Sequence, residues 1–171
     1  NLNSTSTRRA NAIAFDIREA GRLVKENGVE KRVPGRLKAV KGIGWFIEEY
    51  GIAQISYNLT NISITSMHVA FDETCKAAQE RGLRVTGSEL VGLIPLKAML
   101  DAADYFLIKQ ERSLGCSEKE KIKIAIKSLG LDELKLFHPD EKIIEYILEK
   151  DAPKKLIDLT LTDFADETAA E

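Results

Sequence analysis

The chain has 171 residues, which suits one domain with or without an appendage, and its 44% hydrophobic and 30% charged residues are typical of a globular protein. The formal net charge of -2 argues against a nucleic-acid binder that depends on bulk positive charge. No apolar run approaches the ~20 residues that a membrane span needs, and no secretory signal pattern is present. We therefore expect neither nucleic acid nor membrane as a partner.

Cysteine and histidine usage excludes further classes of protein. Cys75 and Cys116 are the only cysteines, which provides no disulfide framework and suits a reducing compartment, so we expect a cytoplasmic protein. No set of His, Cys, Asp and Glu residues has metal-ligand spacing, so we expect no metal cofactor. The chain begins with Asn1 rather than Met and ends inside a helical pattern, so we expect both ends to continue in a longer protein.

The first half of the chain predicts a helix followed by two strands. Apolar residues recur at three- and four-residue spacing from Ser6 to Glu26, which predicts an amphipathic helix that Asn27-Gly28 ends. A strand is expected from Leu37 to about Glu48. The clearest strand runs from Ala53 to Thr60, where apolar and polar side chains alternate strictly. The short connection between these two strands predicts a β-hairpin.

The second half is mostly helical. A helix capped by Thr65 or Ser66 ends at Gly82, and a third strand follows over Leu83–Glu89. Three more helices are expected, the first opening at Pro95, the second covering Ser117–Leu129 and the third opening at Pro139. Residues 151–158 have the composition of a linker, and a last helical pattern then begins.

The order of elements predicts the fold class. If one strand preceded the first helix, the core would be βαββαβ, the ferredoxin-like α+β plan with an antiparallel sheet and two helices on one face. The added C-terminal helices lie outside this plan. The second face of the sheet needs a cover, which a partner domain, a ligand or the later helices could supply.

Three long runs resemble the glutamate formiminotransferase family. They are residues 34–45 (PGRLKAVKGIGW), 53–59 (AQISYNL) and 85–103 (VTGSELVGLIPLKAMLDAA). Residues 1–150 look like the C-terminal subdomain of that transferase. Residues 159–171 are similar to the start of the first cyclodeaminase helix, so the parent resembles a bifunctional formiminotransferase-cyclodeaminase.

The resemblance implies a reaction and partners. The family moves a formimino group from formiminoglutamate to tetrahydrofolate, its co-substrate, during histidine breakdown. Two ferredoxin-like subdomains hold the folate between them, and the catalytic histidine belongs to the N-terminal one, so we assign no catalytic residue here. The expected partners are that N-terminal subdomain, the cyclodeaminase domain and further copies in a homo-oligomer. Only Asn1 to Asn3 remain of the central first strand.

The candidate folate contacts fall into three groups. A polar row on one face of the best strand is either a solvated surface or a wall of the folate cleft. Basic residues before the hairpin either capture substrate carboxylates or are solvated, and two glycines mark either a bulge or close approach of backbone or ligand. The end of the third strand is the last group. The candidates are Gln54, Ser56, Asn58 and Thr60; Arg36 and Lys38, with Lys41 beside them; Gly42 and Gly44; and Gly87, Ser88 and Glu89.

Several alternatives remain open. Trp45 could stack on a ligand ring or belong to the core, and His68 could be an auxiliary base or a packed histidine. The chain could be a non-catalytic assembly module of the same enzyme, and the donor could be formylglutamate instead of formiminoglutamate. RNA binding is disfavoured, because the polar row lacks aromatic residues and the net charge is negative.

Overall fold

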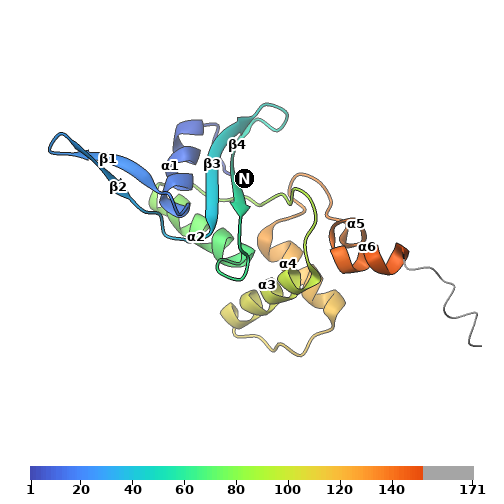
Figure 1. Ribbon diagram of the computed structural model, residues 1–171. Helices are drawn as coiled ribbons and strands as arrows, with labels where there is room; N and C mark the ends of the chain where they lie inside the picture. Colours follow the sequence, from blue (N-terminus) through green and yellow to red (C-terminus); the bar gives the residue numbers. More distant parts are fainter. Residues whose placement is uncertain (152–171) are drawn as a thin grey trace, which may run out of the picture.

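The computed structural model describes residues 1–151 (Figure 1). Its elements are α1 (Thr7–Ile17), β1 (Arg22–Glu26), β2 (Val29–Val33), β3 (Val40–Ile47), β4 (Ile52–Leu59), α2 (Met67–Glu80), α3 (Leu96–Lys109), α4 (Glu118–Leu129), α5 (Pro139–Lys142) and α6 (Ile144–Asp151). The predicted linker beyond Asp151 and the predicted helix start at 159–171 lie outside the described residues. None of the helices in the described part combines the length and hydropathy that crossing a bilayer requires.

The central sheet follows the predicted ferredoxin-like plan. β3 and β4 pair antiparallel along their whole length, from Val40 opposite Leu59 to Ile47 opposite Ile52. The first residues of the chain lie beside β4, since the Leu2 N–H donates to the Ala53 carbonyl at 3.0 Å. On their other side they form an antiparallel bridge to Val85. The α+β prediction is therefore confirmed, with the short first segment in the middle of the sheet.

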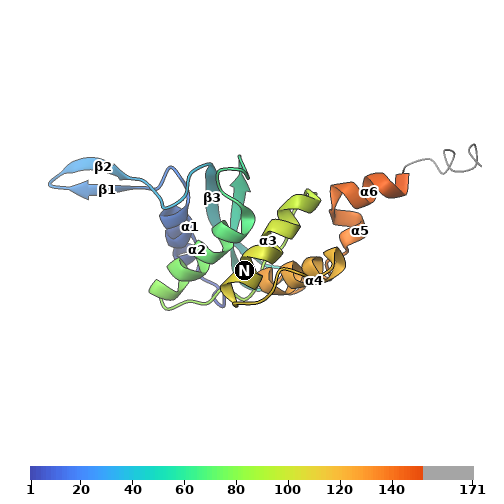
Figure 2. The same cartoon turned by 90° about the horizontal axis from the view of Figure 1, so that it is seen from below.

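One face of this sheet is covered by α1 and α2 (Figures 1 and 2). The helices and the sheet share one hydrophobic core, in which Ile13, Ile17 and Ala77 are fully buried against Ala53. Tyr57 and Leu59 pack against the same cluster. Alternation along β4 then leaves Ser56 and Asn58 on the opposite face, which these helices do not cover.

The first helix is shorter than predicted, and this prediction was wrong from residue 18 onward. α1 ends at Ile17, and residues 22–33 form a separate hairpin, β1–β2. Asn27 and Gly28 both have positive φ (53° and 80°), which is the conformation of a tight two-residue hairpin turn. Asn-Gly between two strands was therefore the signal for a hairpin, whereas Ala20 and Val24 only imitated helical spacing.

The predicted third strand is reduced to an extended segment with one bridge. Its backbone bonds run to the start of the chain, with the Asn3 N–H donating to the Arg84 carbonyl and the Thr86 N–H to the Asn1 carbonyl, both at 3.0 Å. A ladder cannot extend beyond its partner, and the partner here is residues 1–4. Leu83–Glu89 therefore forms no regular strand.

The C-terminal helices form a second core and confirm most of the predicted pattern. Met99 and Ala103 of α3 are fully buried against Ile122 and Ala125 of α4. Ser117 caps α4 with a capping box to Glu120, and Gly130 ends it in the left-handed conformation. The helix predicted from Pro139 is instead two helices.

The break between α5 and α6 lies at Ile143, which is extended and fully buried. It forms a parallel bridge with Ile94, whose N–H donates to the Lys142 carbonyl at 2.9 Å and whose carbonyl accepts from the Ile144 N–H at 3.0 Å. This long-range pairing, together with complete burial of Ile143, replaces the helical bonds that local sequence favours.

A polar cluster joins α2 of the sheet unit to α3 of the helical unit. The Tyr105 hydroxyl donates to Asp72 at 2.7 Å, and Lys109 Nζ donates to the other oxygen of the same carboxylate at 2.5 Å. His68 stacks on Tyr105 with ring centroids 4.7 Å apart. Because both units contribute charged and aromatic groups, this cluster fixes their relative position.

Candidate functional site

The face of β3 and β4 away from α1 and α2 is the candidate site. Cross-strand partners share a face, so Lys41 lies beside Asn58 and Ile43 beside Ser56. These four residues are exposed, and the Trp45 side chain is half exposed at 50%. We name this surface the open face, and we define it by residues 41, 43, 45, 54, 56, 58 and 60. It was predicted to have no cover from this chain's own helices, and Ser56, Asn58 and Thr60 are indeed exposed.

Gln54 is the buried exception in the polar row. Its Oε1 accepts from Trp45 Nε1 at 3.1 Å, and its Nε2 donates to Asn1 Oδ1 at 2.8 Å. Asn1 Nδ2 in turn donates to Glu133 Oε2. This chain of hydrogen bonds ties the open face to the loop that follows α4, so Gln54 holds the surface in shape while its neighbours stay free.

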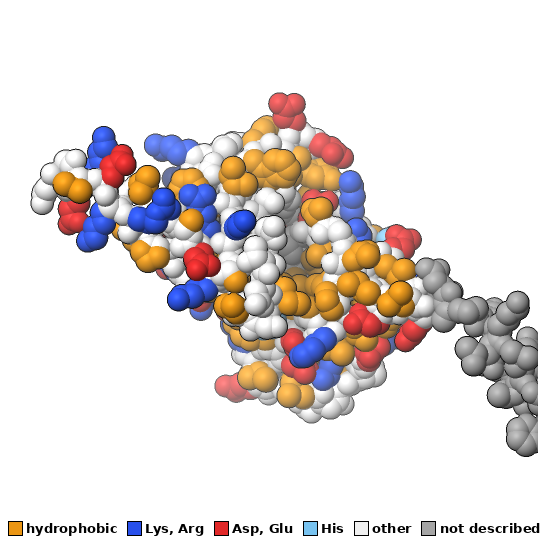
Figure 3. Space-filling model, viewed as in Figure 1, with side chains coloured by type: hydrophobic (Ala, Val, Ile, Leu, Met, Phe, Trp, Pro, Cys, Tyr) orange, Lys and Arg blue, Asp and Glu red, His pale blue; other side chains and the backbone are white. Residues whose placement is uncertain are grey.

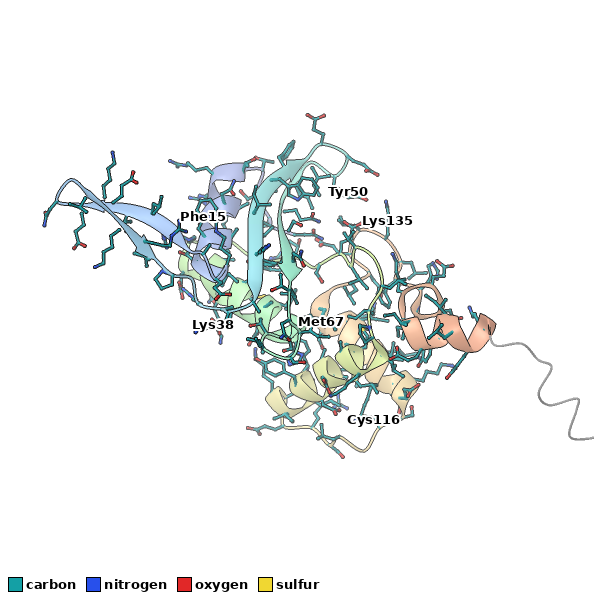
Figure 4. The ribbon with its side chains drawn as sticks, viewed as in Figure 1. Phe15, Lys38, Tyr50, Met67, Cys116 and Lys135 are labelled. Atoms are coloured by element: carbon teal, nitrogen blue, oxygen red, sulfur yellow. The ribbon has the colours of Figure 1, made fainter. Side chains whose placement is uncertain are left out.

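The rim of the open face is apolar and aromatic. Tyr50, in the β3–β4 turn, lies under Lys135 of the helical unit, with Nζ 5.6 Å from the ring centroid. Figure 4 shows these two residues facing each other across the end of the hairpin. The space-filling view shows a hollow between the strands and the C-terminal helices, edged by hydrophobic side chains (Figure 3). The predicted polar row therefore borders a concave surface.

Arg36 is not part of this face. Its guanidinium pairs with Glu80 and lies 3.7 Å from Glu73, both on α2, which covers the other side of the sheet. The hydrogen bond to Glu80 raises the pKa of Arg36. Lys38 is exposed near the β4 end, where its carbonyl accepts from Thr65 Oγ1 at 2.7 Å. Of the basic residues before the hairpin, Lys41 alone is placed on the open face by the strand register.

Gly42 and Gly44 face the helices, opposite to the open face. A Cβ on Gly44 would lie 2.3 Å from the Asn11 nitrogen, and a Cβ on Gly42 would lie 2.7 Å from the Tyr57 ring. Their outward backbone groups are occupied as well, since Asn11 bonds both the N–H and the carbonyl of Gly44 at 3.0 and 2.9 Å. Close approach of backbone was expected here, and the element that approaches is α1.

Residues 1–149 match the family model described as "Formiminotransferase domain". The chain is 45% identical over 156 residues to formimidoyltransferase-cyclodeaminase from Sus scrofa and 44% identical over 172 residues to that from Mus musculus. These alignments cover 91% and 99% of the chain but only 27% and 30% of the relatives. Glutamate formimidoyltransferase from Streptococcus pyogenes serotype M1 is 40% identical over 73 residues, 43% of the chain and 24% of that protein.

The chain belongs to the formiminotransferase family. The resemblance seen in the sequence is thereby confirmed, and the match ends one residue before the predicted boundary at 150. Because the chain spans less than a third of the curated relatives, it represents a part of such a protein. The surfaces it exposes must be considered with that in mind.

The Gly87-Ser88-Glu89 segment of this formiminotransferase part divides into packing and exposure. A Cβ on Gly87 would lie 2.6 Å from the Gly130 carbonyl oxygen, so the two glycines allow the segments to touch. Ser88 Oγ donates to the Leu129 carbonyl at 2.6 Å, which satisfies the end of α4. Only Glu89 is exposed. The strand end therefore joins the two units, and its acid is the group left free.

His68 is packed, as the structural alternative predicted. It is buried between α2 and α3, with Nε2 2.9 Å from Ser66 Oγ. Burial lowers the pKa of His68 and outweighs the opposing effect of Asp101 and Asp72. None of the side chains on the open face is an imidazole or a carboxylate. This face can therefore bind through hydrogen bonds, stacking and one cation, but it offers no base for proton transfer.

Within residues 1–151 no three His, Cys, Asp or Glu side chains are grouped closely enough to hold a metal ion. Sequence reasoning missed the apolar members of the open face, Ile43 and the half-buried Ile47 that continues its row, because β3 was read without its register. Pairing β3 with β4 from the turn at Tyr50-Gly51 outward would have assigned them.

Proposed function

We propose that this chain is the C-terminal half of a formiminotransferase unit and that its open face forms one wall of the folate cleft. The relatives are named formimidoyltransferase-cyclodeaminase and glutamate formimidoyltransferase. The reaction is transfer of a formimino group from formiminoglutamate to tetrahydrofolate in histidine degradation, with tetrahydrofolate as co-substrate and no metal. The observation that supports this proposal is an uncovered sheet face that presents hydrogen-bonding groups beside a half-exposed indole.

The chemistry of a folate suits this face. A reduced pterin presents a flat ring with hydrogen-bonding edges, so it needs an apolar contact and polar partners together. Trp45 and Ile43 supply the first, and Ser56 and Asn58 supply the second, on adjacent strands. Lys41, in register with Asn58, supplies a cation for a glutamate carboxylate. The narrowed set of proposed contacts is thus Lys41, Ile43, Trp45, Ser56 and Asn58.

The proposal assigns binding to this chain and proton transfer to a part that it lacks. Without a general base, the chain alone should bind the folate weakly and turn nothing over. In the proposed arrangement the N-terminal subdomain brings the catalytic histidine to the opposite side of the cleft. The cyclodeaminase domain lies further along the same protein.

Titration with 5-formyltetrahydrofolate tests the wall directly. Trp45 is the only tryptophan in the chain, so its fluorescence reports on ligand at the open face. We expect saturable binding by calorimetry together with a change in Trp45 emission. Asn58→Ala should weaken binding by about tenfold, since one good hydrogen bond contributes ~1.5 kcal/mol.

The matched control is Gln79→Ala, which removes an exposed amide from α2 on the other side of the sheet. This variant should bind like the unaltered chain. Equal loss in both variants, or saturable binding with no change in Trp45 emission, would place the ligand elsewhere. Formimino transfer by the purified chain alone would overturn the division of roles.

A further inference from the structure

The β1–β2 hairpin projects from the molecule as an arm, which we define as residues 22–33 (Figures 1 and 2). All of its residues except Arg22 are exposed. Within residues 1–151, no backbone hydrogen bond joins the arm to another segment. Its length and exposure are unrelated to the open face, so the proposed folate wall does not explain it.

The base of the arm is held firmly. A Cβ on Gly21 would lie 1.8 Å from the Val33 carbonyl oxygen, and one on Gly35 would lie 2.0 Å from the Arg18 carbonyl oxygen, so both strands leave the body at points of backbone contact. Arg22 pairs with Asp16 of α1, and Arg32 Nη1 donates to the Ala20 carbonyl at 2.9 Å. The arm therefore leaves the body in a fixed direction.

The arm is poorly stabilised by its own contacts. An isolated two-stranded hairpin is marginal in water, and three or more strands are needed for independent stability. Val24, Val29 and Val33 share one face of the arm, and their side chains are 38%, 69% and 40% exposed. An apolar face and two unpaired strand edges are features of a surface that pairs with another chain.

The sequence of β1 is complementary to itself in the antiparallel direction. If two copies of β1 pair about Val24, then Val24 lies opposite Val24, and Arg22 of each copy lies opposite Glu26 of the other. Leu23 then lies opposite the aliphatic stem of Lys25. β2 has no such register, because pairing about its middle residue places Lys31 opposite Lys31.

We propose that the arm binds the arm of a second copy of this chain, by antiparallel pairing of the two β1 strands about Val24. The product is a four-stranded sheet in the order β2, β1, β1, β2, with two-fold symmetry. Both Val24 side chains meet at its centre, and the remaining valines extend the same apolar face. This pairing supplies the third and fourth strands that the arm lacks.

Disulfide trapping tests the register. Directly opposed residues of an antiparallel pair have Cα atoms about 4.5–5.5 Å apart, within the span of a disulfide. Val24→Cys should therefore form a covalent dimer of twice the monomer mass under mild oxidation. Val29→Cys is the control, because Val29 is more exposed but lies on the outer strand, away from the two-fold axis. The unaltered chain, which retains Cys75 and Cys116, sets the background.

Sedimentation at several concentrations tests the association itself. We expect the 171-residue chain to form a dimer, and Val24→Asp to weaken it by about tenfold or more, because two carboxylates then meet on the axis. Far-ultraviolet circular dichroism establishes that the variant is folded. A chain that stays monomeric, or equal trapping of the two cysteine variants, would overturn the proposal. In the first case the partner of the arm would be in the part of the relatives that this chain lacks.

Discussion

Gln54 and Asn1 are joined side chain to side chain, Nε2 to Oδ1 at 2.8 Å, although 53 positions separate them in the chain. Gln54 also accepts from Trp45, and Asn1 also donates to Glu133. One buried amide therefore links β3, β4, the central segment and the helical unit. The open face depends on a polar chain that lies mostly beneath it.

Gln54→Ala should destabilise the protein by about 1–3 kcal/mol, because Asn1 Oδ1 and Trp45 Nε1 lose their partner in a buried place. Urea unfolding followed by circular dichroism measures the loss. Asn58→Ala is the matched control, since Asn58 is exposed on the same strand and should change the free energy of unfolding by less than about 0.5 kcal/mol. Equal losses would mean that the polar chain has no special weight.

Gly44→Ala should destabilise the fold by about 1–3 kcal/mol or more. The new Cβ would lie 2.3 and 2.4 Å from backbone atoms of Asn11 and Ala10, which cannot move without shifting α1 away from β3. Gly115→Ala serves for comparison, because its nearest neighbour is the Ser113 hydroxyl at 3.4 Å and the site is an exposed loop. Thermal unfolding should separate the two variants clearly, and similar melting temperatures would contradict the close packing of α1.

Asp72→Asn should cost about 1–2 kcal/mol near neutral pH, because the ion pair with Lys109 and a charge-assisted bond from Tyr105 are lost. Burial opposes ionisation of Asp72, but hydrogen bonds from Lys109 and Tyr105 outweigh it and hold the pKa of Asp72 below its ordinary value. A lowered carboxyl pKa adds stability above the unfolded value of about 3.9 and loses it as the pH falls through the folded pKa.

The difference in unfolding free energy between the unaltered chain and Asp72→Asn should therefore be full at pH 7 and shrink below about pH 4. Denaturant titrations over this range measure it. Asp101→Asn, which breaks an exposed pair with Lys97, is the control and should change stability little at any pH. A constant difference between the Asp72 variant and the unaltered chain across the range would show that its carboxylate charge is unimportant.

His68→Gln should flatten the dependence of stability on pH between about 7 and 5. The pKa of His68 is lowered by burial, so an unfolded chain takes up a proton near pH 6.5 while the folded one does not. More protons then bind the unfolded state, and stability falls with pH by at most about 1.4 kcal/mol per unit from this group. His138→Gln, at an exposed histidine, should keep the original slope. Unchanged slopes in both variants would argue against a buried neutral imidazole.

Local patterns in the sequence predicted the elements that depend on near neighbours. Strict alternation over Ala53–Thr60 predicted β4 and its polar face, and Ser117 with Gly130 predicted the bounds of α4. Family-specific runs predicted membership of the formiminotransferase family, which the match over residues 1–149 confirms. These features follow from capping, periodicity and local backbone preference, all of which act within a few residues.

Tertiary structure decided which predicted contacts share a surface. Arg36 and Lys41 lie five positions apart, yet one pairs with α2 and the other borders the open face, because strand register and helix packing separate them. Ile143 is extended and not helical because Ile94, far away in the chain, satisfies its neighbours. The sequence alone determined the elements and the family, whereas the members of the site and the projecting arm required long-range contacts, whose free energy outweighs local preference.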